Sequence, residues 1–312
     1  MKSKPRFSVL IPLYNKEREV GEALRSVLAQ TLPPEEIVVV DDGSTDNGAA
    51  VVEALAARHP AIRLIRQPNA GVCAARNRAA AVATGDYLTL LDADDAWRPR
   101  FLEEIAALIA EFPGCGFYCT AFDIRSHEGE FPADCPSERG IVGNFFRDSA
   151  HRYIAIPSAS CIPRSVFEAV GGFPDGMKIG EDLYVWVLIA RRWPVCFSPE
   201  RLCRYSRVAS NRSSAIYTPE RTVYSFEALY DPEAPEEERE FLARAALGKS
   251  LTLSAKGGTE DAARAIRTFG FTQTYRRTLR KVQLLNRLPV SWRTPLLNAY
   301  NYLAWKIAKK GL

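Results

Sequence analysis

Residues 37–46 read Ile-Val-Val-Val-Asp-Asp-Gly-Ser-Thr-Asp, and this stretch decides the fold class. Its first four residues are apolar and β-branched, which is typical of a strand that helices cover on both faces. Polar turn residues follow at once, and Ser44 or Asp46 can cap a helix over residues 51–57. The stretch therefore predicts one strand–loop–helix unit of an α/β protein.

The same alternation continues on both sides of this stretch. Further apolar runs that predict strands lie at residues 7–11, 62–65 and 87–91. Apolar residues have helical spacing over residues 19–30, and residues 72–83 are alanine-rich, as is typical of a helix. Repeated units of this kind predict a mostly parallel sheet with helices on its faces.

The pattern loosens after a helix that we expect over residues 101–111. Residues 126–144 are rich in Gly, Pro and charge and are expected to form a loop. Order resumes over residues 158–173, and an apolar helix is expected over residues 180–190. Beyond residue 238 the chain is expected to be helical.

Polar side chains follow three of the predicted strands. Asn15 and Lys16 come after the first strand, Asp41 and Asp42 come after the second, and Asp92, Asp94 and Asp95 come after the fourth. The carboxyl ends of parallel strands meet at one edge of the sheet, where such proteins bind ligands. We therefore expect a binding site at this edge.

The segment Asp92-Ala93-Asp94-Asp95 is a candidate metal site. Carboxylates this close repel one another unless a cation or strong donors neutralise them, and Mg²⁺ or Mn²⁺ takes oxygen ligands while leaving positions for phosphates. A calcium loop of the EF-hand type is excluded, because Ala96 and Trp97 stand where an oxygen ligand and a glycine are needed. Taken alone, the segment also fits a solvated turn in which Asp95 caps the next helix.

The acidic pair Asp41 and Asp42 suits recognition of a nucleotide base. A carboxylate here can accept a charge-assisted hydrogen bond from the N–H of a pyrimidine ring. Gly43 lets the backbone turn or approach a ligand closely. An ordinary loop with carboxylate capping fits the same residues.

Several motifs occur in a fixed order along the chain. They read Val9-Leu10-Ile11-Pro12-Leu13-Tyr14-Asn15, Val40-Asp41-Asp42-Gly43-Ser44-Thr45-Asp46, Asn69-Ala70-Gly71 with Ala75-Arg76-Asn77, and Leu91-Asp92-Ala93-Asp94-Asp95. Later come Val170-Gly171-Gly172-Phe173-Pro174 and Gly180-Glu181-Asp182-Leu183-Tyr184-Val185-Trp186. Over residues 6–208 the chain thereby resembles the inverting glycosyltransferases of family 2. The resemblance implies the GT-A fold, a Rossmann-like α/β fold with a mostly parallel mixed sheet flanked by helices.

The resemblance also implies roles on the donor side, in binding a nucleotide-diphosphate sugar. Pro12 and Tyr14 would line the base pocket, and Glu17 would bond to nearby nucleotide groups. Asp42, or its neighbour Asp41, would read the base.

Further roles concern the diphosphate, the metal and the acceptor. Arg76 would contact the base or the diphosphate. Asp92 would bind the ribose or a metal-bound water, and Asp94 would coordinate a divalent Mn or Mg ion. Asp182 would be the general base. Its neighbour Glu181 is the second catalytic candidate, although acids at a helix start are also favoured by the helix dipole.

Two departures from the family pattern narrow the expectation. Processive members carry Gln-x-x-Arg-Trp, but Ile189 stands where that Gln would precede Arg192-Trp193, so we expect transfer of a single sugar. Many relatives also carry a histidine near the end of this domain. The corresponding segment here has none, so any diphosphate or metal role of that histidine is either absent or taken by Arg207 or Arg212.

The charge distribution sets the end of the chain apart. The 312 residues carry a net charge of +4, yet residues 262–312 hold eleven Lys or Arg and no Asp or Glu, so the rest of the chain is at −7. Residues 271–312 mix these charges with aromatic residues, which suits an anionic membrane surface. A helical cap on the catalytic domain is the alternative. Nucleic acid is not an expected partner, because the body is acidic.

Location and domain organisation follow from these patterns. Residues 1–6 and 7–13 are too short for a secretory signal, and seven scattered cysteines suggest reduced thiols. We therefore expect a cytoplasmic protein, held peripherally on the inner face of the membrane. The expected domains are a GT-A catalytic domain over residues 1–215, nucleotide-binding to about 115 and acceptor-binding beyond, and a basic helical extension over residues 216–312.

The function expected from the sequence is inverting, metal-assisted transfer of one sugar, hexosyl or N-acetylhexosaminyl. The donor is expected to be UDP-linked and the acceptor a cell-surface glycan or a lipid-linked sugar in polysaccharide biosynthesis. A nucleotidyltransferase on a similar sheet and a non-catalytic nucleotide-sugar-binding scaffold are the alternatives. The sequence leaves the sugar, the acceptor and the oligomeric state open.

Overall fold

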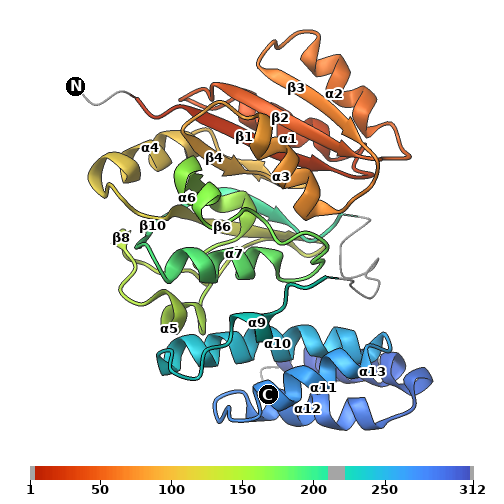
Figure 1. The fold of residues 1–312 in the computed structure, drawn as a ribbon. Helices are drawn as coiled ribbons and strands as arrows, with labels where there is room; N and C mark the ends of the chain where they lie inside the picture. Colours follow the sequence, from red (N-terminus) through yellow and green to blue (C-terminus); the bar gives the residue numbers. More distant parts are fainter. Residues whose placement is uncertain (1–3, 210–221, 310–312) are drawn as a thin grey trace. The chain divides into compact units, whose positions relative to one another are not determined.

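A computed structural model describes residues 4–209 and 222–309, with side chains up to residue 302 (Figure 1). The chain divides into two compact units, Met1–Ile216 and Tyr217–Leu312. We call them the sheet unit and the helical unit. Arg212, one of the two expected substitutes for the missing histidine, lies outside the described residues.

The first half of the sheet unit consists of strand–helix units, as the sequence predicts. The strands are β1 (Phe7–Leu13), β2 (Glu36–Asp42), β3 (Ile62–Gln67) and β4 (Tyr87–Leu90), all parallel, in the order β3-β2-β1-β4. The helices between them are α1 (Val20–Leu28), α2 (Gly48–Ala56) and α3 (Val72–Val82). Residues 37–40 are completely buried in the middle of this half, which accounts for their unbroken apolar run.

The second half of the sheet mixes strand directions. β9 (Ser160–Pro163) is antiparallel to β4 and to β6 (Phe117–Ser126), while β10 (Val195–Ser206) runs parallel to β6. β5 (Ala96–Trp97) pairs antiparallel with β10 and is the last strand in the order of the sheet. The expected mostly parallel, mixed sheet is therefore confirmed.

The segment over residues 126–144 is more ordered than the sequence predicts. β7 (Gly129–Pro132) pairs with β6, and β8 (Gly140–Ile141) pairs with β10. Both strands are short and every residue of β7 is exposed, so they leave little apolar pattern to detect.

Helices cover the second half of the sheet and complete its core. They are α4 (Phe101–Glu111), α5 (Phe145–Ser149), the 3₁₀ turn η1 (Pro157–Ala159), α6 (Arg164–Ala169) and α7 (Glu181–Ala190). Trp186 of α7 is completely buried and stacks on Phe117 of β6, with 4.7 Å between ring centroids. This aromatic pair fixes α7, and with it the acidic residues of its first turn, to the sheet.

The polar loops gather at one edge of this sheet. β1 lies between β2 and β4, and in the register Leu13 of β1 faces Asp41 of β2. The loops that follow these three strands therefore emerge side by side. Asn15 and Asp92 lie in two of these loops and Asp42 ends β2, so the expected residues are at the same edge.

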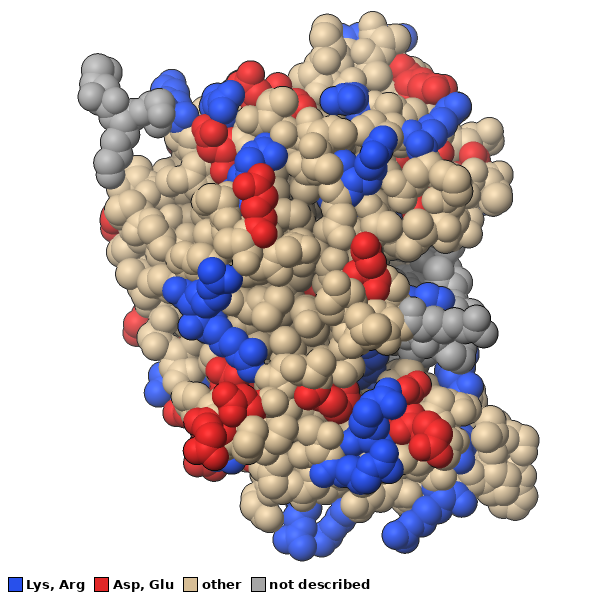
Figure 2. Space-filling view, in the orientation of Figure 1, with Lys and Arg blue, Asp and Glu red and all other residues tan. Residues whose placement is uncertain are grey.

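Five helices make up the described part of the helical unit: α9 (Phe226–Leu229), α10 (Glu236–Ala255), α11 (Thr259–Thr268), α12 (Arg276–Arg287) and α13 (Val290–Lys309). α10 contacts each of the other four. α13 continues through Pro295, although a proline removes one backbone donor and usually kinks or breaks a helix. Figure 2 shows Lys and Arg side chains along the lowest edge of this unit. Among the described residues, no helix is both long enough and apolar enough to cross a membrane.

Gly172, in the turn after α6, has a conformation and a contact that exclude a side chain. Its φ is +75°, and a Cβ there would lie 2.7 Å from Oδ1 of Asn77. Asn77 holds the turn by accepting a bond from the N–H of Phe173 at 2.8 Å and donating one to its carbonyl at 2.9 Å. The adjacent Gly171 also has a positive φ, 82°, but faces open space.

These two glycines provide a matched pair of substitutions. Gly171→Ala should lower the free energy of unfolding by about 1 kcal/mol through backbone strain alone. Gly172→Ala should lower it by about 2–4 kcal/mol, because the Asn77 bonds are disturbed as well. Urea unfolding followed by tryptophan fluorescence measures both values. Equal losses would show that the Asn77 contact does not stabilise the turn.

Candidate active site

The loops after β1 and β2 are joined by hydrogen bonds. Asn15, the one non-glycine residue with positive φ (51°) in the described chain, accepts a bond from the N–H of Thr45 at 2.7 Å and donates its own N–H to Ser44 Oγ at 3.0 Å. Glu17 accepts a bond from the N–H of Asn47 at 3.1 Å, and the N–H of Glu17 donates to Asp46 at 2.8 Å. Glu17 therefore bonds to the start of α2. This structural role is separate from the nucleotide contact that is expected for it.

The two acids expected to read a base have different surroundings. Asp42 is buried and accepts bonds from the N–H groups of Ala70 and Gly71, at 2.9 and 2.8 Å, and from the Gln67 side chain at 2.7 Å. Asp41 accepts the N–H of Ser44 at 3.0 Å, within its own loop. Asp42 therefore holds the loop after β3 against β2.

Pro12 and Tyr14 lie on either side of the last residue of β1, and both are partly exposed at the polar edge of the sheet. Partial exposure at this edge leaves surface for a ligand to cover. The positions of both residues are thus consistent with the base-pocket roles expected for them.

Asp94 lies in the loop after β4 and forms an ion pair with Lys16. Nζ of Lys16 is 2.7 Å from Oδ2 of Asp94, and both side chains are largely buried, with exposed fractions of 12% and 18%. The pair connects the first loop of the sheet to the acidic segment. The sequence places Lys16 in the polar cluster after the first strand, but it does not predict the pairing, because no local pattern reveals a partner at a distance of 78 residues.

Arg76, on α3, lies between the acids of the two halves of the sheet unit. Its guanidinium is 2.7 Å from Oδ1 of Asp92 and 3.0 Å from Oε1 of Glu181, and its centre is 5.0 Å from the ring of Phe173. The arginine side chain is only 2% exposed. Burial alone would lower the pKa of Arg76, but the charges of Asp92 and Glu181 raise it above its ordinary value. The structure therefore brings together three of the predicted site residues.

Glu181 and Asp182 form the first turn of α7, directly after Gly180, whose φ is 78°. Burial raises the pKa of both carboxyl groups, and the neighbouring charge of Asp182 adds to the effect on Glu181. Arg76 opposes this rise at both acids, and a bond from the N–H of Leu183 at 2.8 Å opposes it at Asp182. Carboxyl groups with raised pKa values are suited to accepting and releasing protons near neutral pH.

Asp95 does not cap the following helix, in contrast to the alternative considered for it. It is buried, accepts a bond from the N–H of Ser206 at 2.7 Å and bonds to the hydroxyl of Ser158. The same hydroxyl accepts the N–H of Asp92 at 3.0 Å. α4 begins only at Phe101, too far along the chain for Asp95 to cap it. Asp95 instead ties the acidic segment to η1 and β10.

Arg207, the other expected substitute for the missing histidine, follows this contact along the chain. It comes directly after Ser206, its side chain is exposed, and its guanidinium lies 6.0 Å from the centre of the Tyr205 ring. Because the N–H of Ser206 bonds to Asp95, the backbone of Arg207 lies next to the acidic segment.

The carboxylates of Asp92 and Asp94 fit a hard divalent cation in their chemistry. Both belong to one short segment, and in the structure each is paired with a positive charge, from Arg76 and Lys16. Within residues 4–209 and 222–302, no group of three or more His, Cys, Asp or Glu side chains is arranged to hold a metal. The protein therefore offers a partial ligand set, of the kind that Mg²⁺ completes with waters and substrate phosphates.

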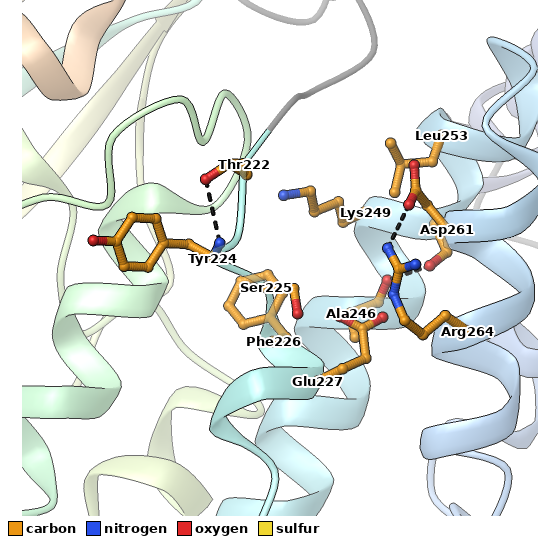
Figure 3. A pocket seen from close by; sticks show the side chains of 11 residues that line it. Thr222, Tyr224, Ser225, Phe226, Glu227, Ala246, Lys249, Leu253, Asp261 and Arg264 are labelled. Carbon is orange, nitrogen blue, oxygen red and sulfur yellow. Dashed lines mark hydrogen bonds and ion pairs between the residues drawn. The ribbon is translucent and has the colours of Figure 1, made fainter.

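A small cavity in the helical unit is separate from these residues (Figure 3). It has a volume of about 60 Å³ and lies between α9, α10 and α11, where Lys249 and the paired Asp261 and Arg264 line it. Ligand pockets usually measure about 300–1,000 Å³. None of the predicted site residues lines this cavity, so we do not assign the donor site to it.

The titration of Glu181 should be visible in protein stability. Its pKa rises from 4.5 to about 7 on folding, so the native state binds this proton more tightly than the unfolded chain. The free energy of unfolding is then highest below pH 4.5, the pKa of Glu181 in the unfolded chain. It falls as the pH rises from 4.5 to about 7. In Glu181→Gln this contribution, about 3 kcal/mol at most, should be absent from urea unfolding measured across the window.

Glu53→Gln, at an exposed acid paired with Arg66, is the control and should keep the pH dependence of the wild type. If Glu181→Gln also keeps it, the acid does not titrate in this window.

Comparison with known proteins finds similar glycosyltransferases. The model of the family described as "Glycosyl transferase family 2" matches residues 8–171. The glycosyltransferase YibD of Escherichia coli K12, described as uncharacterized, is 36% identical over 139 residues, or 45% of this chain and 40% of YibD. Chondroitin synthase of E. coli is 36% identical over 103 residues, or 33% of this chain and 15% of that protein. The matches thus span less than half the length of these relatives.

Solved structures share the fold. S. aureus TarS 1–349 aligns with a TM-score of 0.68 and 19% identity, over 95% of this chain and 91% of that one. The mannosyltransferase PcManGT from Pyrobaculum calidifontis, solved with GDP-Man and Mn²⁺, aligns with a TM-score of 0.53 and 21% identity, over 98% and 76%. The expected GT-A fold is confirmed by these neighbours. With the family model covering more than half of its residues, the chain belongs to glycosyltransferase family 2.

Proposed function

We propose that this protein is a glycosyltransferase that moves a single sugar, with inversion at the anomeric carbon, from a nucleotide-diphosphate sugar to an acceptor hydroxyl. The observation that carries the proposal is the position of Arg76, 2.7 Å from Asp92 and 3.0 Å from Glu181. An inverting transfer needs one group of side chains for the leaving diphosphate and another, across the sugar, for the acceptor. Arg76 forms ion pairs with one acid of each group, Asp92 on the donor side and Glu181 on the acceptor side.

On the donor side we propose that the nucleotide lies along the polar edge of the sheet. Pro12 and Tyr14 line the base pocket, and Asp41 or Asp42 reads the base. Asp42 already accepts bonds from three donors, so a base would use its remaining acceptor position or replace one of these donors. Glu17, Arg76 and Asp92 complete the proposed donor site, with Arg76 on α3 and the two acids in the loops after β1 and β4.

The donor is proposed to be UDP-linked and to carry a hexosyl or N-acetylhexosaminyl group. The support is that TarS, which shares the fold, has been solved with UDP-GlcNAc and with UDP. The acceptor is proposed to be a cell-surface glycan or a lipid-linked sugar in polysaccharide biosynthesis. Non-processive transfer rests on Ile189, which replaces the glutamine of processive relatives.

A divalent Mn or Mg ion is proposed to bind at Asp94, with Asp92 beside it. When bound, such an ion supplies positive charge to the departing diphosphate. PcManGT, of similar fold, has been solved with Mn²⁺. In this chain Lys16 lies against Asp94, so the lysine must leave this carboxylate, or share it, when a metal binds.

Asp182 is proposed as the general base, with Glu181 as the second candidate. Its raised pKa lets Asp182 accept the proton of the acceptor hydroxyl as that oxygen attacks the anomeric carbon. Glu181 bonds to Arg76 and positions the first turn of α7 against α3. The two acids thus divide proton transfer and positioning between them.

We propose that the catalytic domain comprises residues 1–215, with nucleotide binding by residues 1–115 and acceptor binding by residues 116–215. Residues 216–312 form a basic extension. The protein is proposed to work in the cytoplasm, held peripherally on the inner face of the membrane by residues 271–312.

Release of nucleoside diphosphate from a panel of nucleotide sugars with Mn²⁺ tests the proposed reaction. The wild type should release it slowly without acceptor, and Asp182→Asn should lower turnover with acceptor by about 10²–10⁴-fold through loss of the base. Asp94→Ala should lower turnover through loss of the metal. Asp231→Asn, at an exposed aspartate of the helical unit, is the control and should behave as wild type.

The products distinguish the alternatives in the same assay. Release of pyrophosphate would replace the proposal with nucleotidyl transfer. Binding of a nucleotide sugar without turnover on a competent acceptor would indicate a scaffold.

Metal binding itself should respond to Lys16. Lys16→Met removes a positive charge 2.7 Å from Asp94, so Mn²⁺ should bind the donor-free protein about fivefold more tightly or better. The signal of free Mn²⁺ in electron paramagnetic resonance measures this affinity without any turnover. Arg18→Met, at an exposed basic residue two positions away, is the matched control. Weaker binding in Lys16→Met would mean that Lys16 does not compete with the metal.

A further inference from the structure

An exposed apolar stripe runs along α13 in the helical unit. Its members recur at helical spacing on one side of the helix: Trp292, Pro295, Leu296, Ala299 and Tyr300. The large ones are well exposed, at 62% for Trp292, 46% for Leu296 and 48% for Tyr300. Single exposed apolar residues are common on proteins, but a continuous stripe marks a surface that meets a partner.

The rest of α13 is already packed against its own unit. Arg293 is buried and donates to the carbonyl of Ser254 at 3.1 Å and to the hydroxyl of Thr259 at 2.9 Å. Thr294 donates to the carbonyl of Ala255 at 2.8 Å. These bonds fix which side of the helix faces the unit, so the stripe is the outer side of a docked helix.

The neighbouring helix α12 presents a basic outer side. Its exposed basic residues are Arg276, Arg277, Arg280, Lys281 and Arg287. The opposite side is apolar and buried through Leu279, Val282 and Leu285. Leu284, 64% exposed, lies among the basic residues and adds apolar surface to them.

The basic side and the apolar stripe adjoin each other. Nζ of Lys281 on α12 lies 4.3 Å from the centre of the Tyr300 ring on α13. The two helices are consecutive in the helical unit (Figure 1), and the lowest edge of that unit in Figure 2 carries Lys and Arg side chains. We call the combined surface the α12–α13 face. No acid occurs anywhere in residues 262–312, so nothing in that stretch offsets its charge.

We propose that the α12–α13 face binds an anionic phospholipid membrane. The stripe of α13 enters the boundary between headgroups and acyl chains, and the arginines of α12 contact lipid phosphates. Charge complementarity selects this partner. A second copy of the chain would present the same positive charge and be repelled. The inference deepens the proposed peripheral location, and because binding is measured without donor or acceptor, its failure would leave the proposed transfer reaction untouched.

Flotation of the full chain with vesicles tests the proposal. Vesicles of phosphatidylcholine with phosphatidylglycerol should bind the protein, and vesicles of phosphatidylcholine alone should bind it weakly. Binding should weaken as salt is raised. Each basic residue near the membrane contributes about fivefold in affinity, so Arg277→Ala with Arg280→Ala should lower the affinity about twenty-five-fold. Arg58→Ala, at an exposed arginine of the sheet unit, should leave binding unchanged.

The apolar part of the face is tested separately. Trp292→Ala with Leu296→Ser should abolish the binding that remains at high salt, because salt does not screen apolar contacts. Ile141→Ala, at an exposed apolar residue of the sheet unit, is the matched control. Lipids brominated near the headgroup should also quench the fluorescence of the wild type more than that of Trp292→Phe.

Three results would overturn the proposal. The first is failure of the full chain to bind the anionic vesicles. The second is binding that the α12 and α13 substitutions leave unchanged. The third is a change in oligomeric state on Trp292→Ala with Leu296→Ser, measured by light scattering, which would assign the face to a second copy of the chain. Normal release of nucleoside diphosphate by the arginine variant would show that it is folded.

Discussion

The arrangement of the sheet unit depends on keeping one arginine charged where little water reaches it. Removing both Asp92 and Glu181 would leave the charge of Arg76 uncompensated in the interior, and breaking a buried ion pair costs about 3–5 kcal/mol. Its partners come from opposite halves of the sheet unit, Asp92 from the loop after β4 and Glu181 from the first turn of α7. Phe173, from the turn that Gly172 and Asn77 shape, covers the guanidinium. The ion pairs of Arg76 thereby hold the two halves in a fixed relation.

This arrangement explains why the acids of α7 can differ from ordinary surface acids. A buried carboxyl group usually becomes neutral, and one that lies next to a cation usually ionises. Glu181 and Asp182 experience both influences, and the structure balances them so that the pKa of each stays raised. The same cation also serves Asp92, so any ligand that competes for Asp92 changes the charge that α7 experiences. Events on the donor side can therefore alter the protonation of α7 without a large movement of the backbone.

The first half of the fold could be predicted from the sequence, because runs such as residues 37–40 are buried on both faces and carry the signal locally. The strands β7 and β8 could not, since they are short and mostly exposed. The site divides in the same way. Arg76, Asp92 and Glu181 were named from motifs, and the structure brings them together. Lys16 beside Asp94, and Ser158 beside Asp92 and Asp95, depend on contacts between distant segments that leave no periodic pattern. The nucleotide and metal roles of these residues remain proposals.

Asn15 has a consequence for how the protein could recognise a ligand. Its left-handed backbone and its bonds to Ser44 and Thr45 join the first two loops of the sheet into a single body before anything binds. A ligand that settles on these loops loses little affinity to ordering them, so more of its contact energy appears as affinity. The same rigidity restrains change over evolutionary time. A substitution in one loop displaces the other, so a new ligand specificity at these two loops requires both of them to change together.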